Sequence, residues 1–209
     1  MTKPATLVHV IDDDAAVRNA LRWLFEGESL IVQTYASAEE FLATFSNELP
    51  GCAVVDLRMP GMSGLELQET LARRRVQLPL VFVTAHGDVS LAVMAMRRGA
   101  VDFVEKPFAD ERLVDAVRRA LGTHERHPDG EEEPGIVRAR AAGLSARERD
   151  VLVAVVEGKS SKVIAAELGI ATKTVEAHRA RIMSKLGARS LAGLVRLVVR
   201  HGLLELPRS

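Results

Sequence analysis

Short apolar runs alternate with helical patterns along the first 122 residues of the chain. Runs of four or five consecutive apolar residues are typical of strands that are buried on both faces of a sheet. Between these runs, apolar residues recur at the spacing of an amphipathic helix, as Val17, Leu21 and Phe25 do. The alternation predicts an α/β fold with a doubly wound, five-stranded parallel sheet. The predicted strands cover residues 7–11, 31–35, 52–55, 80–83 and 101–104.

Serine and aspartate residues precede several helical patterns and predict where those helices begin. Ser37 and Ser63 are each followed three residues later by a glutamate, which is the spacing of a capping box. Asp14 is expected to cap the helix that follows the first strand. This cap accounts for one carboxylate and leaves Asp12 and Asp13 without a structural role.

Four of the predicted strands end in side chains that can take part in chemistry. These side chains are Asp12 with Asp13, Asp56, Thr84 and Lys106. Ligands of open parallel sheets bind outside the carboxyl ends of the strands, so these side chains are expected to converge. The alternative is a set of unrelated polar caps, and Asp56 alone also fits an ordinary turn position.

Three carboxylates that lie close together raise one another's pKa unless a cation joins them. Their hard oxygen atoms suit Mg²⁺, and the cation in turn attracts a phosphoryl group. Asp56 is then the expected nucleophile, and it would form an aspartyl phosphate. Lys106 would neutralise the phosphoryl oxygens, and the Thr84 hydroxyl would donate a hydrogen bond to one of them.

Residues 7–121 resemble the receiver domains of two-component response regulators. The blocks HVIDDD, VVDLRMPGMSG, VFVTAHGD and VDFVEKPF match that family in identity, order and spacing. The resemblance implies a flavodoxin-like receiver fold in which Asp56 is phosphorylated by a sensor histidine kinase and Lys106 precedes a cis proline. The Mg²⁺ ligands that the resemblance implies are Asp12, Asp13, Asp56 and the backbone carbonyl of Arg58. The switch and phosphoryl-binding residues that it implies are Thr84, Phe103 and Lys106.

Charge is unevenly distributed, although the whole chain is formally neutral. Residues 1–122 carry 13 Lys and Arg against 17 Asp and Glu, whereas residues 144–209 carry 12 against 6. Residues 123–143 between them are rich in Pro, Gly and like charges, which is typical of a linker, although 136–142 also fit a short helix. The sequence thus predicts a receiver domain over 1–122 that binds a cation, a linker over 123–143, and a second domain over 144–209 that binds a polyanion.

Helical patterns fill the second domain. Ser145 and Glu148 predict a capping box, Gly169 falls in a tight turn, and Thr172 is the expected N-cap of a longer helix. Two helices joined by such a turn, the second with a basic exposed side, are typical of a helix-turn-helix. On charge alone this side also fits an ordinary solvated surface. The residues expected on the DNA-facing side are Lys173, Thr174, Glu176, Ala177, His178, Arg179, Ala180, Arg181 and Lys185.

Residues 144–199 resemble the LuxR-type output domain through LSARERDVL, KVIAAELGIATKTVEAHRARIMSKL and SLAGLVRL. The whole chain resembles the NarL/FixJ-type transcriptional regulators, and the HGD after Thr84 together with DFVEKPF favours the FixJ side. The DNA phosphate contacts that this resemblance implies are Lys173, Thr174, His178 and Lys185. The residues that it places at or near base edges are Glu176, Ala177, Arg179 and Ala180.

The expected function is a transcriptional regulator that a histidine kinase switches on by phosphorylating Asp56. The phosphorylated chain is expected to form a homodimer, to bind promoter DNA and to act with RNA polymerase. The dimer is expected to use the surface formed by the helix over 88–98, the strand 101–104 and the helix that begins at about Asp110. Charges of both signs are expected on that surface, including Asp102, Arg112 and Arg119.

Two other functions are alternatives. Aspartyl-phosphate hydrolases also use an Asp nucleophile with Mg²⁺, but they resemble one another in an Asp-x-Asp block. Arg58 occupies the second position of that block here, so no general acid or base is expected beside Asp56, and the chain is not expected to be an enzyme. The second alternative is a phosphorylation-independent receiver that controls the DNA-binding domain as an interaction module, against which Thr84, Lys106 and the acidic residues argue.

The single cysteine, Cys52, lies in a predicted buried strand, which excludes an internal disulfide and fits a reducing compartment. No charged and then apolar leader follows Met1, and no apolar run approaches the length of a membrane span. The protein is therefore expected in the cytoplasm and without a membrane partner.

Overall fold

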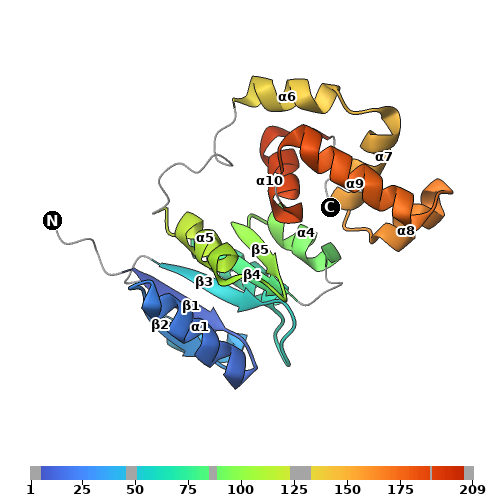
Figure 1. Cartoon of the computed structure of the whole chain (residues 1–209). Coiled ribbons are helices and arrows are strands. Elements are labelled where there is room, and N and C mark those ends of the chain that lie inside the picture. Colours follow the sequence, from blue (N-terminus) through green and yellow to red (C-terminus); the bar gives the residue numbers. More distant parts are fainter. Residues whose placement is uncertain (1–5, 46–50, 85–88, 123–132, 189, 205–209) are drawn as a thin grey trace. The chain divides into compact units, whose positions relative to one another are not determined.

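The computed structural model describes residues 6–45, 51–84, 89–122, 133–188 and 190–204 of the chain. The chain divides into two compact units, the first built around a sheet and the second composed of helices (Figure 1). Within the described residues, no helix is both long and apolar enough to span a membrane.

Five parallel strands form one sheet in the order β2-β1-β3-β4-β5. The strands are β1 (Leu7–Ile11), β2 (Ile31–Tyr35), β3 (Gly51–Asp56), β4 (Leu80–Thr84) and β5 (Asp102–Glu105). The chain passes from β1 to β2 on one side and then returns to β3 on the other, so the direction of winding changes between β1 and β3. The predicted doubly wound α/β fold with a five-stranded parallel sheet is confirmed.

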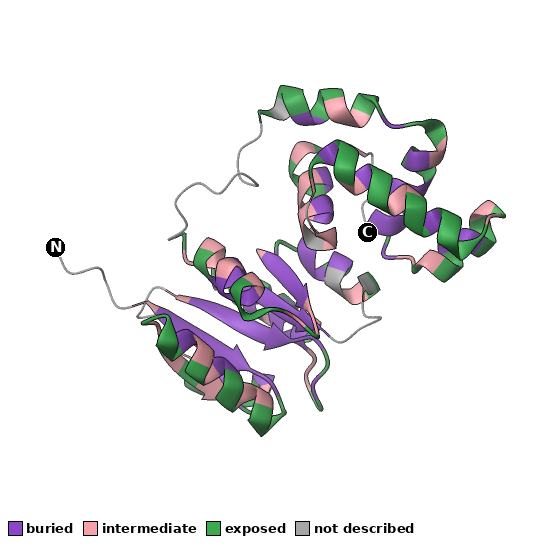
Figure 2. Cartoon of the chain, in the orientation of Figure 1, coloured by how far each residue is buried: buried purple, intermediate pink, exposed green. Residues whose placement is uncertain are grey.

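The central strands are buried on both faces, as their continuous apolar sequences predict. The edge strand β2 instead alternates, with Ile31 exposed at its start and Tyr35 buried at its end. Figure 2 shows the same contrast between the buried central strands and the striped helices around them. Cys52 is fully buried in β3, and burial raises the pKa of its thiol to about 12.

Helices α1 (Ala15–Gly27) and α5 (Asp110–Ala120) pack on one face of the sheet. Leu21 and Phe25 of α1 and Leu113 of α5 share a core cluster with apolar residues from β1, β3, β4 and β5. The other helices of this alternating region are α2 (Ala38–Thr44), α3 (Gly64–Arg73) and α4 (Val89–Arg97).

The predicted capping boxes of the first unit form to different extents. Ser63 and Glu66 make a complete box at the start of α3. At α2, the Ser37 side chain accepts the N–H of Glu40, but the Glu40 carboxylate accepts the N–H of Ala36 at 2.6 Å. Only half of the second predicted box is therefore present.

The helices in the second half of the chain share one apolar core, which includes Leu152, Ile164 and Ile182. They are α6 (Pro134–Ala142), α7 (Ala146–Val156), α8 (Ser161–Leu168), α9 (Thr172–Leu186) and α10 (Leu191–His201). The predicted box of Ser145 is complete at α7. The N-cap of α9 is Ala171, whose backbone is extended, so the expectation that Thr172 is this cap is wrong by one residue.

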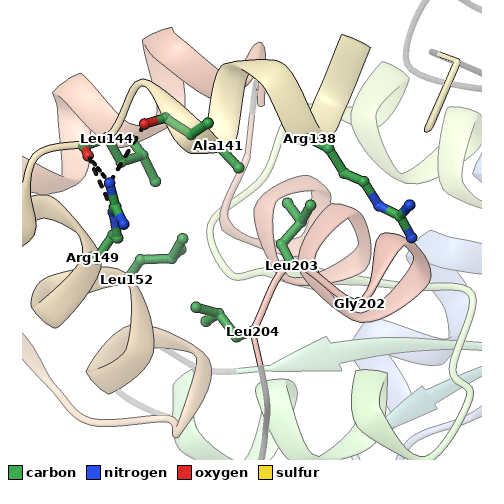
Figure 3. A pocket seen from close by; sticks show the side chains of 9 residues that line it. Arg138, Ala141, Leu144, Arg149, Leu152, Gly202, Leu203 and Leu204 are labelled. Carbon is green, nitrogen blue, oxygen red and sulfur yellow. Dashed lines mark hydrogen bonds between the residues drawn. The ribbon is translucent and has the colours of Figure 1, made fainter. Parts of the chain in front are cut away.

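Helix α6 lies inside the stretch that the sequence predicts as a linker. Its Val137 is fully buried, and Arg149 of α7 donates to the carbonyl oxygens of Ala142 and Leu144 at 3.4 and 2.9 Å. A cavity of about 310 Å³ lies between α6, α7 and the residues that follow α10 (Figure 3). Its lining includes Leu144, Leu152, Leu203 and Leu204 together with Arg138 and Arg149. The last part of the predicted linker is therefore folded against the helices that follow it.

Candidate functional site

Three of the predicted strand-end residues meet at one edge of the sheet. Asp12 directly follows β1, Asp56 ends β3 in register with Val83 of β4, and Lys106 directly follows β5. Lys106 Nζ lies 3.2 Å from Asp12 Oδ2 and 2.9 Å from Asp56 Oδ1. These side chains come from positions far apart in the sequence, and the parallel sheet brings them together.

Each carboxylate of this group is also held by a main-chain N–H. Asp12 Oδ1 accepts from Asp14 N at 2.9 Å, and Asp56 Oδ2 accepts from Arg58 N at 2.6 Å. The side chains of Asp12 and Asp56 are only 4% and 11% exposed. Two acids so far removed from water require a counter-charge, and Lys106 provides it.

Burial and charge act in opposite directions on these groups. Burial raises the pKa of Asp12, against the opposing effects of the Asp14 N–H and of Lys106. Burial alone would lower the pKa of Lys106, but its hydrogen bond to Asp56 and the charges of Asp12 and Asp56 outweigh burial and raise it. The ammonium group therefore stays charged and can meet an incoming anion.

The loops that carry these carboxylates are fixed by close main-chain contacts. A Cβ on Gly64 would lie 2.5 Å from the main-chain oxygen of Asp56, so the start of α3 can approach β3 only with glycine at this position. Arg18 Nη1 donates to the carbonyl oxygens of Asp12 and Asp13 at 2.7 and 2.9 Å. The sequence pattern does not single out Arg18, because its partners are carbonyl groups that every residue carries.

The remaining predicted residues of this site are arranged around the group. Thr84 is buried at the end of β4, and its carbonyl oxygen accepts the N–H of Lys106 at 2.7 Å. Phe103 is buried in β5, and the Lys106–Pro107 peptide bond is cis, as the resemblance implies. Asp13 is exposed, and the described residues contain no group of three His, Cys, Asp or Glu side chains placed to hold a metal ion.

Asp12 and Asp56 nevertheless present a donor set of the kind that Mg²⁺ prefers. Their oxygen atoms are hard ligands, and a single ammonium group lies within hydrogen-bond distance of both. Arg58, whose main-chain carbonyl is the other predicted ligand, lies two residues beyond Asp56 and is linked to it through its N–H. The chemistry of these residues therefore fits a hard divalent cation.

The predicted DNA-facing residues lie on α9, whose other side packs into the helical core. The core residues of α9 are Val175, Ile182 and Leu186. Arg179 Nη1 donates to Ser161 Oγ of α8 at 2.8 Å, and His178 Nδ1 is buried without a hydrogen-bond partner in the described part of the chain. His178 and Arg179 are half-buried. The exposed members of the predicted set are Lys173, Thr174, Glu176, Ala177, Ala180, Arg181 and Lys185.

Lys185, near the end of α9, forms hydrogen bonds to the start of α7 and the residues just before it. Its Nζ donates to Glu148 Oε2 at 2.7 Å and to the carbonyl oxygen of Gly143 at 3.2 Å. The hydrogen bond from Lys185 and then that from Ser145 N lower the pKa of Glu148 to about 2. The sequence marks Glu148 only as a capping residue, because its ion-pair partner is 37 positions away.

We expect the helical unit to lose stability in acid as Glu148 becomes protonated. The folded-state pKa of about 2 is below the ordinary value of 4.5, so the stabilisation is complete above pH 4.5 and is lost as the pH falls toward 2. Urea unfolding of the full chain over this range should show a flatter pH dependence for Glu148→Gln. The exposed neighbour Asp150, changed to Asn, is the control, and an unaltered slope in Glu148→Gln would contradict this assignment.

Two protein families match this chain. Residues 8–118 match the response regulator receiver domain, and residues 142–198 match the luxR family of bacterial regulatory proteins. The chain is 47% identical over 195 residues to the transcriptional regulatory protein FixJ of Azorhizobium caulinodans, which covers 93% of this chain and 92% of FixJ. It is 44% identical over 199 residues to the transcriptional regulatory protein TdiR of Thauera aromatica, which covers 95% of this chain and 88% of TdiR.

The fold agrees with these matches. The structure of full-length FixJ from B. japonicum is similar to this chain with a TM-score of 0.54 and 41% identity, and the match covers 98% of this chain and 100% of FixJ. The receiver match includes the meeting point of Asp12, Asp56 and Lys106, and the luxR match includes α7, α8 and α9. The chain therefore belongs to the NarL/FixJ-type response regulators, two-component transcriptional regulators that join a receiver domain to a LuxR-type DNA-binding domain.

Proposed function

We propose that a sensor histidine kinase phosphorylates Asp56 and that phosphorylation converts the chain into a dimer that binds promoter DNA. The observation that supports this most strongly is the meeting of Asp12, Asp56 and Lys106 at the carboxyl edge of the sheet. A carboxylate beside a fixed ammonium group is a suitable nucleophile, because the oxygens of its phosphorylated product already have a counter-charge.

The proposed transfer uses residues that are already in place. An oxygen of Asp56 forms a bond to phosphorus, and the phosphorus–nitrogen bond of the kinase phosphohistidine breaks, with its electron pair returning to the imidazole. The Lys106 ammonium then turns from Asp56 to a phosphoryl oxygen, and the Thr84 hydroxyl donates to another. Mg²⁺, when bound, supplies further positive charge against the phosphoryl group. Its proposed ligands are Asp12, Asp13, Asp56 and the main-chain carbonyl of Arg58.

The proposed switch involves two buried residues on neighbouring strands. Thr84 ends β4 and Phe103 lies on β5, which pairs with β4 in parallel register. Movement of the Thr84 hydroxyl toward the phosphoryl group would vacate space into which the Phe103 ring can turn. The surface of β5 and α5 would then change shape and become the dimer contact. The dimer would carry two DNA-binding domains to paired half-sites and act there with RNA polymerase.

Sedimentation of the full chain tests this proposal directly. We expect mainly monomer without ligand, and dimer with Mg²⁺ and a phosphoryl mimic such as beryllium fluoride. Affinity for a two-half-site duplex should rise at least about tenfold, because the second half-site is then bound at a high effective concentration. If the mimic is bound at Asp56 and neither association nor DNA affinity changes, the receiver instead acts as a phosphorylation-independent interaction module.

The proposed DNA contacts divide into two kinds. The side chains assigned to phosphates are Lys173, Thr174, His178 and Lys185, and those assigned to or near base edges are Glu176, Ala177, Arg179 and Ala180, with Arg181 on the same surface. Phosphate contacts release counterions without reading sequence, whereas a guanidinium in the major groove can pair with guanine.

We expect Lys173→Ala to weaken binding to all DNA sequences alike and to reduce the salt slope by about one. We expect Arg179→Ala instead to alter which sites are preferred. Binding to target and scrambled duplexes over a salt series measures both effects. Ser161→Ala is the matched control, because it removes the hydrogen-bond partner of Arg179 and keeps the guanidinium. Equal losses of sequence preference in Lys173→Ala and Arg179→Ala would contradict the division.

A further inference from the structure

A buried group of charges joins β5 to α5. Asp102, the first residue of β5, is fully buried. Arg112 donates to it through both terminal nitrogens, from Nη1 to Oδ2 at 2.9 Å and from Nη2 to Oδ1 at 3.1 Å. Arg119, two turns further along α5, also donates to Oδ2. The expectation that Asp102 is an exposed charge at a dimer surface is therefore wrong, because the arginines of its own chain enclose it.

These residues also hold the main chain of Phe103. Asp102 Oδ1 accepts the N–H of Phe103 at 2.9 Å, and Arg112 Nη2 donates to the carbonyl oxygen of Phe103 at 3.3 Å. Both main-chain polar groups of Phe103 thus have partners in the buried group. Because successive strand residues point to opposite faces, Asp102 faces α5 while the Phe103 ring lies on the other side of the sheet.

We propose that Arg112 is a positioning residue for the switch. Its hydrogen bond holds the main chain of Phe103 against α5, so that on phosphorylation the ring turns while the backbone stays in place. Without this hydrogen bond, the Phe103 ring occupies both its original and its turned position whether or not Asp56 is phosphorylated. The phosphorylated and unphosphorylated states of the receiver then differ less. The inference rests on the proposed function, because it assigns Arg112 to the switch of Thr84 and Phe103.

Arg119 offers a matched comparison on the same helix. It contacts the same carboxylate and is similarly buried, with a side chain 21% exposed against 30% for Arg112. Its Nε is buried without a hydrogen-bond partner among the described residues. Of these two arginines, Arg112 is the one for which the described part of the chain shows bonds both to the carboxylate of Asp102 and to the main chain of Phe103. Arg119 therefore neutralises Asp102, whereas Arg112 also fixes the backbone.

The test compares Arg112→Gln with Arg119→Gln in the full chain. The readout is the ratio of DNA affinities with and without beryllium fluoride and Mg²⁺. In Arg112→Gln we expect this ratio to fall about tenfold, mainly because the unphosphorylated chain binds DNA more tightly. In Arg119→Gln we expect the ratio to stay at its wild-type value. Hydrogen exchange of the Phe103 N–H should quicken in Arg112→Gln alone. Urea unfolding monitors folding, and Arg112→Lys, which keeps the charge without the planar fork, should also lower the ratio.

The possible results separate this inference from the function on which it rests. A wild-type chain that does not respond to the phosphoryl mimic overturns the proposed function, and the exchange of the Phe103 N–H then decides the positioning role by itself. A responsive wild type with an unchanged ratio in Arg112→Gln overturns the role of Arg112. Equal loss of the ratio in Arg112→Gln and Arg119→Gln overturns it as well, since both would then act only through the charge of Asp102.

Discussion

Asp56→Asn should accept no phosphoryl group, either from a histidine kinase or from a small donor such as acetyl phosphate. The asparagine amide has nearly the same shape, and its oxygen can still accept the N–H of Arg58, but it lacks the negative charge of the nucleophile. Wild-type chain should gain one phosphoryl group in intact-mass measurements, and only when Mg²⁺ is present, because buried carboxylates repel an incoming anion.

Asp14→Asn is the matched control for this experiment. Asp14 is exposed and caps α1 by accepting the N–H of Ala16 at 2.8 Å, and asparagine is an equally good cap. This variant should therefore fold and be phosphorylated like the wild type. Peptide mapping that places the phosphoryl group of the wild type on any residue other than Asp56 would refute the assignment.

Lys106→Ala should keep part of the phosphorylation and lose most of the switching. The ammonium group contacts an oxygen of Asp56 and does not itself form the new bond. We therefore expect its loss to have a small effect on the rate of phosphorylation and a large effect on the gain in DNA affinity that phosphorylation produces. A charge-assisted hydrogen bond contributes about 1.5–3 kcal/mol, which corresponds to a loss of about 10- to 150-fold in the response. The response is the ratio of DNA affinities with and without phosphorylation.

The same substitution also changes the resting state. Removing Lys106 leaves the buried carboxylates of Asp12 and Asp56 without their shared counter-charge, so the receiver should become less stable at neutral pH. Lys106→Arg keeps a positive charge at this place and should preserve stability better. If phosphorylation raises the DNA affinity of Lys106→Ala as much as that of the wild type, contact between Lys106 and the phosphoryl group is not needed for the switch.

The sheet and the main members of its site follow from local sequence patterns. Continuous apolar runs predict buried parallel strands, and parallel strands end at a common edge, so the meeting of Asp12, Asp56 and Lys106 needs no knowledge of longer-range packing. The amphipathic pattern of α9 is predictable for the same reason, because Val175 and Ile182 lie at helical spacing.

Contacts between side chains from distant parts of the chain are not predictable in this way. Asp102 is a charged residue, which normally indicates a surface position, and only the packing of α5 shows that two arginines enclose it. Lys185 belongs by its position to a solvent-exposed face, yet its ammonium group is bound to Glu148. In both cases the partner lies on another element, and no periodicity connects the two positions.

The buried thiol in β3 has a practical consequence for labelling experiments. Cys52 is the single cysteine of the chain, it is fully buried, and its pKa of about 12 leaves almost no thiolate at neutral pH. Maleimide dyes and spin labels react with thiolates, so the wild-type protein should resist them while it is folded. A pair of cysteines introduced on the surface, one in each unit, would therefore be modified without background and would report the separation of the two units by fluorescence energy transfer.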